Sequence, residues 1–474
     1  MGNLTWCLRA CALFVVWATT AVTMPAQTFK TIHNFDSTDG AFPWAAPVQG
    51  NDGNLYGTTQ NGGNTACASG CGTVFKITPA GKLTMFSFDG TNGSAPFAGL
   101  VQAANGDLYG TTSSGGTSGN CTNGCGAVFK ITPSGKLTTL HNFNYSDGAD
   151  VLGTLVLATD GNYYGTTQIG GFYGGGTVFK IAPSGTLTTV HNFTNGPDGG
   201  FPVAGMIQAT DGNLYGTTWT GGSDNNNDGT VFKLTLSGKL TTLHSFDLTD
   251  GALPFAGLVQ ATDGDFYGTT EEGGIDNYGT VFKITPKGKL TTLHSFSGGT
   301  DGDTPISPLV QAIDGNFYGT ASYDGLYPNY GIVFEITPKG VLTILHNFDS
   351  TDGSYPYAGL VQATSGRFYG ATFAGGSSNA CQFGCGTVFS LSLGLGPFVE
   401  TLPTSGNVGT AVRILGTNLT GATSVRFHGT AAKFKVISKS EIQTHVPAGA
   451  TTGPVEVKIT KNTLKSNVVF RVTK

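Results

Sequence analysis

Three pairs of cysteines stand out among the residues that could do chemistry. Each pair has three residues between its cysteines and a glycine just before the second: Cys67 and Cys71, Cys121 and Cys125, Cys381 and Cys385. This spacing favours local disulfides in an oxidising compartment. A zinc site is the alternative, but zinc needs four converging ligands and no histidine lies in these loops. We therefore predict three disulfides and no metal site.

Histidines are also candidates, but six of the eight recur at one position of a repeated segment: His33, His141, His191, His244, His294 and His346. A catalytic or metal-binding residue should occur once or converge on one centre. One repeat has Phe86 at this position, which favours packing over chemistry. We expect these histidines to be structural.

Carboxylates are the remaining candidates for catalysis or metal binding. Glu271 and Glu272 could act as acid and base on a polysaccharide, but neighbours on a strand usually point opposite ways. The Asp-Gly loops at 36–40 and 349–353 leave calcium as a minor possibility, although turn formation explains them better. No phosphate-binding loop, dinucleotide-binding motif or nucleophile elbow lies in its required context. We predict no catalytic residue and no cofactor.

The element that must position these residues is a segment that occurs seven times. It reads Asp-Gly-Asn-Leu-Tyr-Gly-Thr-Thr, then Gly-Gly, a variable loop and Gly-Thr-Val-Phe-Lys-Ile-Thr. Its Tyr-Gly core recurs every 51 to 55 residues, at Tyr56, Tyr109, Tyr164, Tyr215, Tyr267, Tyr318 and Tyr369. A period of this size indicates a repeat architecture.

Each repeat predicts four antiparallel strands, here called a to d from the centre outward. In the fifth repeat they lie at 256–261, 265–270, 279–285 and 290–296, joined by turns rich in Asp, Pro and Gly. Four strands in about fifty residues describe a β-propeller blade. The seventh repeat lacks its d strand, and residues 28–35 supply a matching sequence. We therefore predict a seven-bladed propeller closed by the N-terminal strand; an open solenoid would leave that strand unexplained.

The Asp-Gly-x-Leu-Tyr-Gly-Thr-Thr, Gly-Gly and Gly-Thr-Val-Phe pattern resembles the GloVer (Gloeobacter–Verrucomicrobia) tandem repeat of exported bacterial proteins. The resemblance covers roughly residues 28–393. It implies a secreted or surface-displayed repeat protein without an established catalytic set, so no functional residue is carried over from it.

The chain changes character at Pro397, where the repeat stops and lysines become frequent. Residues 397–474 carry a net charge of +7 and the remainder −12. Short alternating strands suit a small β-sandwich. The pattern Pro403-x-Ser405-Gly406, Gly409, Ile414-x-Gly416-x-Asn418 and Val446-Pro447 resembles an IPT/TIG immunoglobulin-like domain. In that family, bacterial members are mostly extracellular modules.

The N-terminus has the features of an export signal. Arg9 precedes an apolar run at 11–18 that is too short to span a membrane, and small residues follow. We expect a signal peptide at 1–26, a propeller at 27–394 and a sandwich at 397–474, secreted or held at the cell surface or in the periplasm. We expect a monomer with no membrane span, and no nucleic-acid partner, because no basic–aromatic stripe accompanies the basic tail.

A binding site should lie where the repeats differ. The a–b and c–d turns are nearly identical, whereas the b–c and d–a loops vary and share one face of the ring. The predicted ligand contacts are in the fourth to sixth blades: Trp219, Glu271, Tyr278, Tyr323 and Tyr327. Each aromatic could instead only cover a neighbouring loop. The leading hypothesis is a non-enzymatic binding or scaffold protein for an extracellular glycan or protein; the alternative is a polysaccharide hydrolase or lyase using Glu271 and Glu272.

Overall fold

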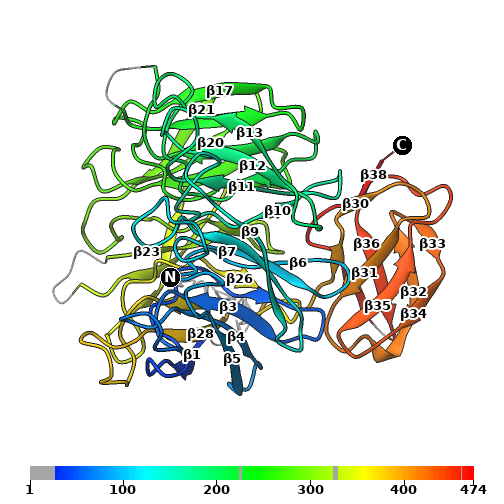
Figure 1. Cartoon of the computed structure of the whole chain (residues 1–474). Coiled ribbons are helices and arrows are strands. Elements are labelled where there is room, and N and C mark those ends of the chain that lie inside the picture. The colour runs from blue at the N-terminus through cyan, green and yellow to red at the C-terminus, as the bar shows by residue number, and fades with distance from the viewer. Residues whose placement is uncertain (1–26, 224–226, 324–328, 461, 474) are drawn as a thin grey trace, which may run out of the picture.

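The computed structural model describes residues 27–223, 227–323, 329–460 and 462–473. The predicted signal peptide and Tyr327 lie outside these residues. Within them the chain is all-β: a seven-bladed β-propeller is followed by a small immunoglobulin-like β-sandwich. In Figure 1 the sandwich, coloured orange to red, lies to one side of the propeller, next to β6 (Val101–Gln102).

Each blade is a four-stranded antiparallel sheet. The a strands nearest the axis are β2 (Val48–Gln49), β6, β10 (Val156–Leu157), β14 (Ile207–Gln208), β18 (Val259–Gln260), β22 (Val310–Gln311) and β26 (Val361–Gln362). The b strands are β3 (Leu55–Thr59), β7 (Leu108–Thr112), β11 (Tyr163–Thr167), β15 (Leu214–Thr218), β19 (Phe266–Thr270), β23 (Phe317–Ala321) and β27 (Phe368–Thr372). Blades are numbered 1 to 7 in this order.

The outer half of each blade follows the same plan. The c strands are β4 (Thr73–Ile77), β8 (Ala127–Ile131), β12 (Thr177–Ile181), β16 (Thr230–Leu234), β20 (Thr280–Ile284), β24 (Ile332–Ile336) and β28 (Thr387–Ser392). The d strands are β5 (Leu83–Ser87), β9 (Leu137–Asn142), β13 (Leu187–Asn192), β17 (Leu240–Ser245), β21 (Leu290–Ser295), β25 (Leu342–Asn347) and, in blade 7, β1 (Thr28–Asn34). The predicted closure is confirmed, because β1 pairs antiparallel with β28.

Packing within the blade explains the Tyr-Gly core. In blade 4 a Cβ atom added to Gly216 would lie 2.7 Å from Cζ of Phe232 on the next strand, so only glycine leaves room for that ring. The preceding Tyr215 is fully buried, and its hydroxyl donates to Asp211 at 2.9 Å. Lys233 contacts the same carboxylate at 2.7 Å. The Asp, Tyr-Gly and Phe-Lys parts of the repeat therefore form one packing unit.

The recurring histidines are structural, as predicted. In six blades the Nε2 atom of the d-strand histidine lies 2.7–3.0 Å from an aspartate in the following d–a loop, and His33 and Asp39 are one such pair. In blade 1, where Phe86 replaces the histidine, Asn92 replaces the aspartate. Asp36 accepts from the backbone N–H and hydroxyl of Thr38. These loop carboxylates therefore stabilise the turns and bind the histidines.

The C-terminal domain contains two four-stranded sheets and a short parallel pair. One sheet has the order β29 (Glu400–Leu402), β31 (Ala411–Leu415), β35 (Glu441–His445), β34 (Phe434–Val436). The other has β33 (Thr430–Ala432), β32 (Ala422–Phe427), β36 (Val455–Ile459), β37 (Asn462–Lys465). Strands β30 (Ser405–Gly406) and β38 (Arg471–Val472) form the parallel pair, and η1 (Leu419–Gly421) is a single 3-10 turn. Val412, Val425 and Phe470 belong to the buried core between the sheets.

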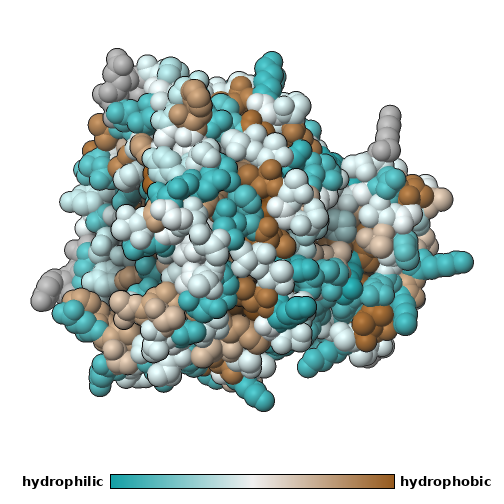
Figure 2. Space-filling model, viewed as in Figure 1, coloured by the Kyte–Doolittle hydropathy of each residue, from teal (hydrophilic) through white to brown (hydrophobic). Residues whose placement is uncertain are grey.

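The propeller has two different faces. The b–c and d–a loops lie on one, called the loop face, where they are joined by bridges such as Ala41 to Asn61. The a–b and c–d turns lie on the other, called the turn face. In the described part of the chain no helix is long and apolar enough to cross a membrane. Figure 2 shows hydrophobic residues on the visible side as scattered patches between hydrophilic ones.

Candidate functional site

Seven equivalent residues surround the propeller axis where each chain segment enters its inner strand. One comes from each blade, and none is charged: Trp44, Phe97, Leu152, Val203, Phe255, Ile306 and Tyr357. The inner strands run from the loop face to the turn face, so these residues lie toward the loop face. We call them the axial ring.

Repeated d–a loop geometry sets the position of the axial ring. Two residues before each ring member the backbone adopts positive φ, as at Phe42 (59°) and Asp150 (54°). Phe42 belongs to a bulky residue type for which this conformation is unusual, and the loop is held there by hydrogen bonds to the b–c loop. In blade 1, the N–H of Gln60 donates to the carbonyl of Phe42 at 3.1 Å.

Aromatic side chains from blades 7, 1 and 2 form a contiguous cluster in and around this ring. Trp44 stacks on Tyr357 with centroids 4.5 Å apart, and its indole also contacts Phe97 and Phe373 at 5.1 and 5.2 Å. Phe42 stacks on Phe373 at 4.8 Å. All five side chains are half-buried, so part of each remains open to a ligand.

A tryptophan–carboxylate pair lies beside this cluster. Trp219 of blade 4 donates from Nε1 to Oε2 of Glu271 of blade 5 at 3.2 Å. Burial raises the pKa of Glu271, and the charge of Glu272 adds to the rise, while the Trp219 hydrogen bond opposes it. Burial raises the pKa of Tyr357, with further contributions from Tyr323 and Glu271, so blades 5, 6 and 7 converge here.

Two aspartates on the same face also have raised pKa values. Burial alone accounts for the rise at Asp150. At Asp303 burial dominates, and a hydrogen bond from Thr304 partly offsets it. The rise in both pKa values shows that these two carboxylates are partly removed from solvent. In the described ranges no three His, Cys, Asp or Glu residues converge on a possible metal position.

The structure brings only some of the predicted contact residues together. Trp219 and Glu271 form the pair above. The rings of Tyr323 and Tyr355 are 5.6 Å apart, and Tyr355 in turn stacks on Tyr357 of the cluster. Tyr278 is 40% exposed and lies against the backbone at Gly298, a glycine of the blade 5–6 connection. Tyr327 is not described. Glu271 is half-buried whereas Glu272 is exposed, so the two carboxylates differ in surroundings.

The sequence-based prediction missed the axial ring and placed the emphasis elsewhere. The aromatic cluster around Trp44 lies in blades 7, 1 and 2, whereas the predicted contacts lie in blades 4 to 6. All three predicted disulfides are present, in blades 7, 1 and 2. Aligning the repeats on the position just before Ala-Gly-Leu-Val-Gln would have revealed Trp44, Phe97, Phe255 and Tyr357 as a variable apolar set.

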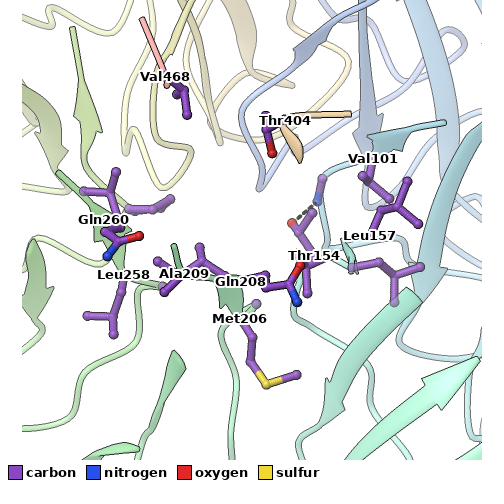
Figure 3. A pocket seen from close by; sticks show the side chains of 18 of the residues that line it. Val101, Thr154, Leu157, Met206, Gln208, Ala209, Leu258, Gln260, Thr404 and Val468 are labelled. Atoms are coloured by element: carbon purple, nitrogen blue, oxygen red, sulfur yellow. Dashed lines mark hydrogen bonds between the residues drawn. The ribbon is translucent and has the colours of Figure 1, made fainter. Parts of the chain in front are cut away.

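A cavity of about 1290 Å³ continues from the axial ring toward the turn face. Its wall comes from residues in and next to the inner strands, such as Val101, Leu157 and Leu258. Figure 3 shows these side chains around the cavity, with Thr404 and Val468 of the C-terminal domain across from Gln208 and Ala209.

Comparison with solved structures finds similar chains at low sequence identity. The periplasmic gluconolactonase of Pseudomonas aeruginosa is 18% identical over 73% of this chain and 96% of its own, with a TM-score of 0.44. A fungal alcohol oxidase in complex with copper is 12% identical over 94% and 99%, with a TM-score of 0.49. A luciferin-regenerating enzyme is 12% identical over 62% and 89%, with a TM-score of 0.40. These names describe those proteins, and the likeness concerns the fold alone.

Among curated proteins, none matches the sequence. Two protein-family profiles match the chain. The profile described as the Gloeobacter/Verrucomicrobia repeat matches residues 18–122, 115–263 and 225–434, and the IPT/TIG domain profile matches residues 398–472. The chain therefore belongs to the Gloeobacter/Verrucomicrobia repeat family and ends in an IPT/TIG domain.

Proposed function

We propose that the protein is an exported binding protein whose propeller recognises an extracellular glycan through the loop face. The observation that supports this is the half-buried aromatic cluster around Trp44 beside the Trp219–Glu271 pair. A neutral sugar has apolar C–H faces, which pack on aromatic rings, and hydroxyl groups, which bond to a carboxyl group. An extracellular protein segment is the other partner predicted from the sequence.

In this proposal residues 1–26 direct export, residues 27–394 form the recognition ring and residues 397–474 form the accompanying domain of a monomer. Three disulfides suit an oxidising compartment outside the cytoplasm.

The proposal is tested by calorimetric titration of the mature protein with cellohexaose, xylohexaose and mannohexaose. At least one should bind, and Trp44→Ala should weaken that binding about tenfold, since a lost aromatic contact costs about 1 kcal/mol beyond its burial. Trp219→Ala should weaken it too. Lys287→Ala changes an exposed residue on the turn face and should leave the affinity unaltered. Binding that depends on Lys287 and not on Trp44 would place the site on the wrong face.

A second candidate function is a polysaccharide-active enzyme. The observation that favours it is the half-buried Glu271 carboxyl group bound to Trp219, because burial raises its pKa, which is the direction a general acid requires. New reducing ends or unsaturated ends released from the polysaccharide would establish catalysis. Glu271→Gln should then abolish release while Glu272→Gln preserves it.

A further inference from the structure

The C-terminal domain covers the turn-face end of the axial cavity. Ser440 donates to the carbonyl of Asn51 in blade 1 at 2.9 Å. Arg471 donates to the carbonyl of Thr210 in blade 4 at 2.7 Å. Blades 1 and 4 lie on different sides of the ring, so the domain extends across the axis. A ligand that enters through the axial ring therefore meets the C-terminal domain at the other end of the cavity.

The cavity joins the aromatic cluster to the C-terminal domain. Trp44, Phe97 and Tyr357 of the cluster line the same space as Arg471. The volume of this space, about 1290 Å³, exceeds the range of about 300–1,000 Å³ typical of small-molecule sites. The cavity is therefore large enough for several sugar units of one chain, which would contact the cluster at one end and Arg471 at the other.

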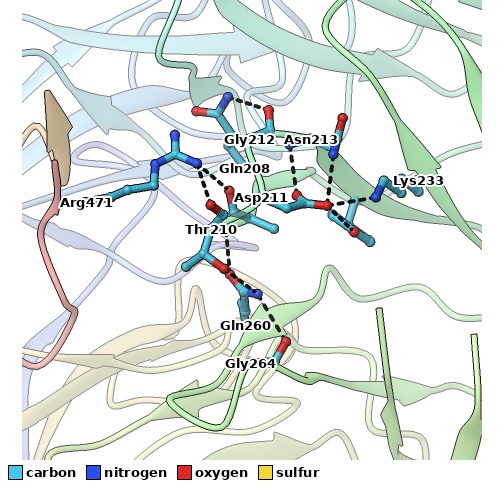
Figure 4. Close-up of polar contacts among 11 residues, drawn as sticks. Gln208, Thr210, Asp211, Gly212, Asn213, Lys233, Gln260, Gly264 and Arg471 are labelled. Carbon is cyan, nitrogen blue, oxygen red and sulfur yellow. Dashed lines mark hydrogen bonds and ion pairs between the residues drawn. The ribbon is translucent and has the colours of Figure 1, made fainter. Parts of the chain in front are cut away.

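Arg471 carries a positive charge that no carboxylate compensates in the described part of the chain. Its Nη1 atom donates to the carbonyl oxygens of Thr210 at 2.7 Å and Ala209 at 3.4 Å, and Figure 4 shows both bonds leaving this one nitrogen. A guanidinium has five N–H donors, and within the described residues Nη2 and Nε have no hydrogen-bond partner. The carbonyls hold the half-buried side chain in place without cancelling its charge.

The carboxylates near Arg471 are bound to lysines. Asp263 is the only other charged residue among the described residues that line the cavity, and Lys283 binds it at 2.9 Å. Lys283 also binds Asp265 at 2.8 Å, a residue outside the cavity lining. Asp211, in the same turn as the carbonyl that Arg471 binds, is held by a lysine of its own blade at 2.7 Å (Figure 4). None of these carboxylates pairs with Arg471, so its charge is left for a ligand.

Uncharged polar groups surround this end of the cavity. They come from the C-terminal domain and carry hydroxyl or amide groups: Thr404, Ser405, Asn407 and Asn467. Sugar hydroxyl groups both donate and accept hydrogen bonds, as these side chains do. The end of the cavity thus combines one guanidinium with partners for the hydroxyl groups of a sugar.

We propose that the glycan bound by this protein is acidic: a uronic-acid oligosaccharide that enters through the axial ring and places a carboxylate on Arg471. This inference rests on the proposed function, because the aromatic cluster around Trp44 is the other part of the same site. A uronic-acid unit keeps the C–H faces that pack on aromatic rings and adds one carboxylate. Guanidinium and carboxylate form paired, charge-assisted hydrogen bonds, which partial burial strengthens. The C-terminal domain therefore supplies the residue that selects an acidic glycan.

The test is calorimetric titration of the mature protein with two pairs of hexasaccharides that differ only at C6. One pair is cellohexaose and the β-1,4-glucuronate hexamer, and the other is mannohexaose and the β-1,4-mannuronate hexamer. In at least one pair the acidic member should bind about tenfold more tightly than the neutral one. Arg471→Gln should reduce this ratio to about twofold or less and leave the Kd of the neutral member within about twofold.

The matched control is Arg426→Gln. Arg426 lies in the same domain and also donates from Nη1 to a backbone carbonyl, that of Gly429, at 2.9 Å, but it does not line the cavity. The variant loses the same charge and should keep the preference for the acidic hexamer. Arg471→Lys retains the charge and should retain part of the preference. Thermal unfolding shows whether each variant is folded, and the comparison within each pair needs only the parent protein.

The outcomes separate this inference from the proposed function. Trp44→Ala should weaken binding of both members of a pair, and unchanged binding of both would refute the proposed function. Equal affinity for the acidic and neutral members of both pairs would overturn the inference alone. A preference that persists in folded Arg471→Gln, or that is lost equally in Arg426→Gln, would also overturn it. Absence of binding by all four hexasaccharides would contradict both.

Discussion

The two ends of the inner strands differ in how much the residue at equivalent positions varies from blade to blade. At the turn face, six blades carry a glutamine whose side-chain oxygen accepts a hydrogen bond from a backbone N–H in the a–b turn of the preceding blade. These are Gln49, Gln102, Gln208, Gln260, Gln311 and Gln362. Blade 3 has Leu157 instead. At the loop end, the axial ring has six residue types in seven positions. Uniform positions therefore join the blades, and varied positions are free to specify a ligand.

The largest effect is expected from removing the strand that closes the ring. Deleting residues 28–35 removes β1 and Phe35, which is fully buried, and exposes the edge of β28. We expect loss of cooperative thermal unfolding and aggregation in size-exclusion chromatography. Lys30→Ala changes an exposed residue of the same strand and serves as the control. A truncated protein that stays monomeric with the parent Tm would refute closure by β1.

A smaller effect is expected from the disulfides of the loop face. Each closes a loop of five residues, so replacing both Cys121 and Cys125 with alanine should lower the free energy of unfolding by about 2 kcal/mol. Denaturant unfolding measures this change. Dithiothreitol should destabilise the parent protein and have no effect on a variant that lacks all three pairs. Destabilisation of that variant by the reductant would contradict this assignment.

The glutamines of the turn face should each contribute less. Gln260→Leu copies the residue that blade 3 has naturally, and it removes the bonds to Thr210 and Gly264. Because Thr210 is exposed and water can replace one partner, we expect a loss of about 1 kcal/mol in denaturant unfolding. Gln168→Ala, at a varied position of the loop face, should change stability less. A larger loss of stability in Gln168→Ala than in Gln260→Leu would contradict the view that the turn-face glutamines join the blades.

The smallest effect concerns pH and Glu400 in the link to the C-terminal domain. Burial raises the pKa of Glu400 to about 7. The folded protein therefore favours the protonated form of Glu400. This contribution to the free energy of unfolding is fully present below the unfolded pKa of about 4.5 and is lost as the pH rises to 7. Glu400→Gln should gain Tm over the parent protein across that range, by at most about 2 °C because the residue is partly exposed. A constant Tm difference from pH 4.5 to 8 would contradict this.

The fold could be predicted from the sequence because its causes are local and repeated. The Tyr-Gly core, the Asp-Gly turns and the missing d strand each have a physical reason within one blade. Docking of the C-terminal domain could not be predicted, since it uses backbone carbonyls such as those of Asn51 and Thr210, which leave no sequence signal. The aromatic cluster was missed because Trp44 and Tyr357 are 313 residues apart and meet only when the ring closes.

The most direct test of the account compares Trp44→Ala with Gln260→Leu in one calorimetric titration series, with cellohexaose, xylohexaose and mannohexaose as probes. The account predicts that Trp44→Ala raises the Kd of the bound oligosaccharide about tenfold while unfolding remains cooperative. Gln260→Leu should lower stability and leave the Kd within about twofold. An unchanged Kd in Trp44→Ala, together with a weakened one in Gln260→Leu, would contradict the claim that the varied end of the inner strands binds the ligand.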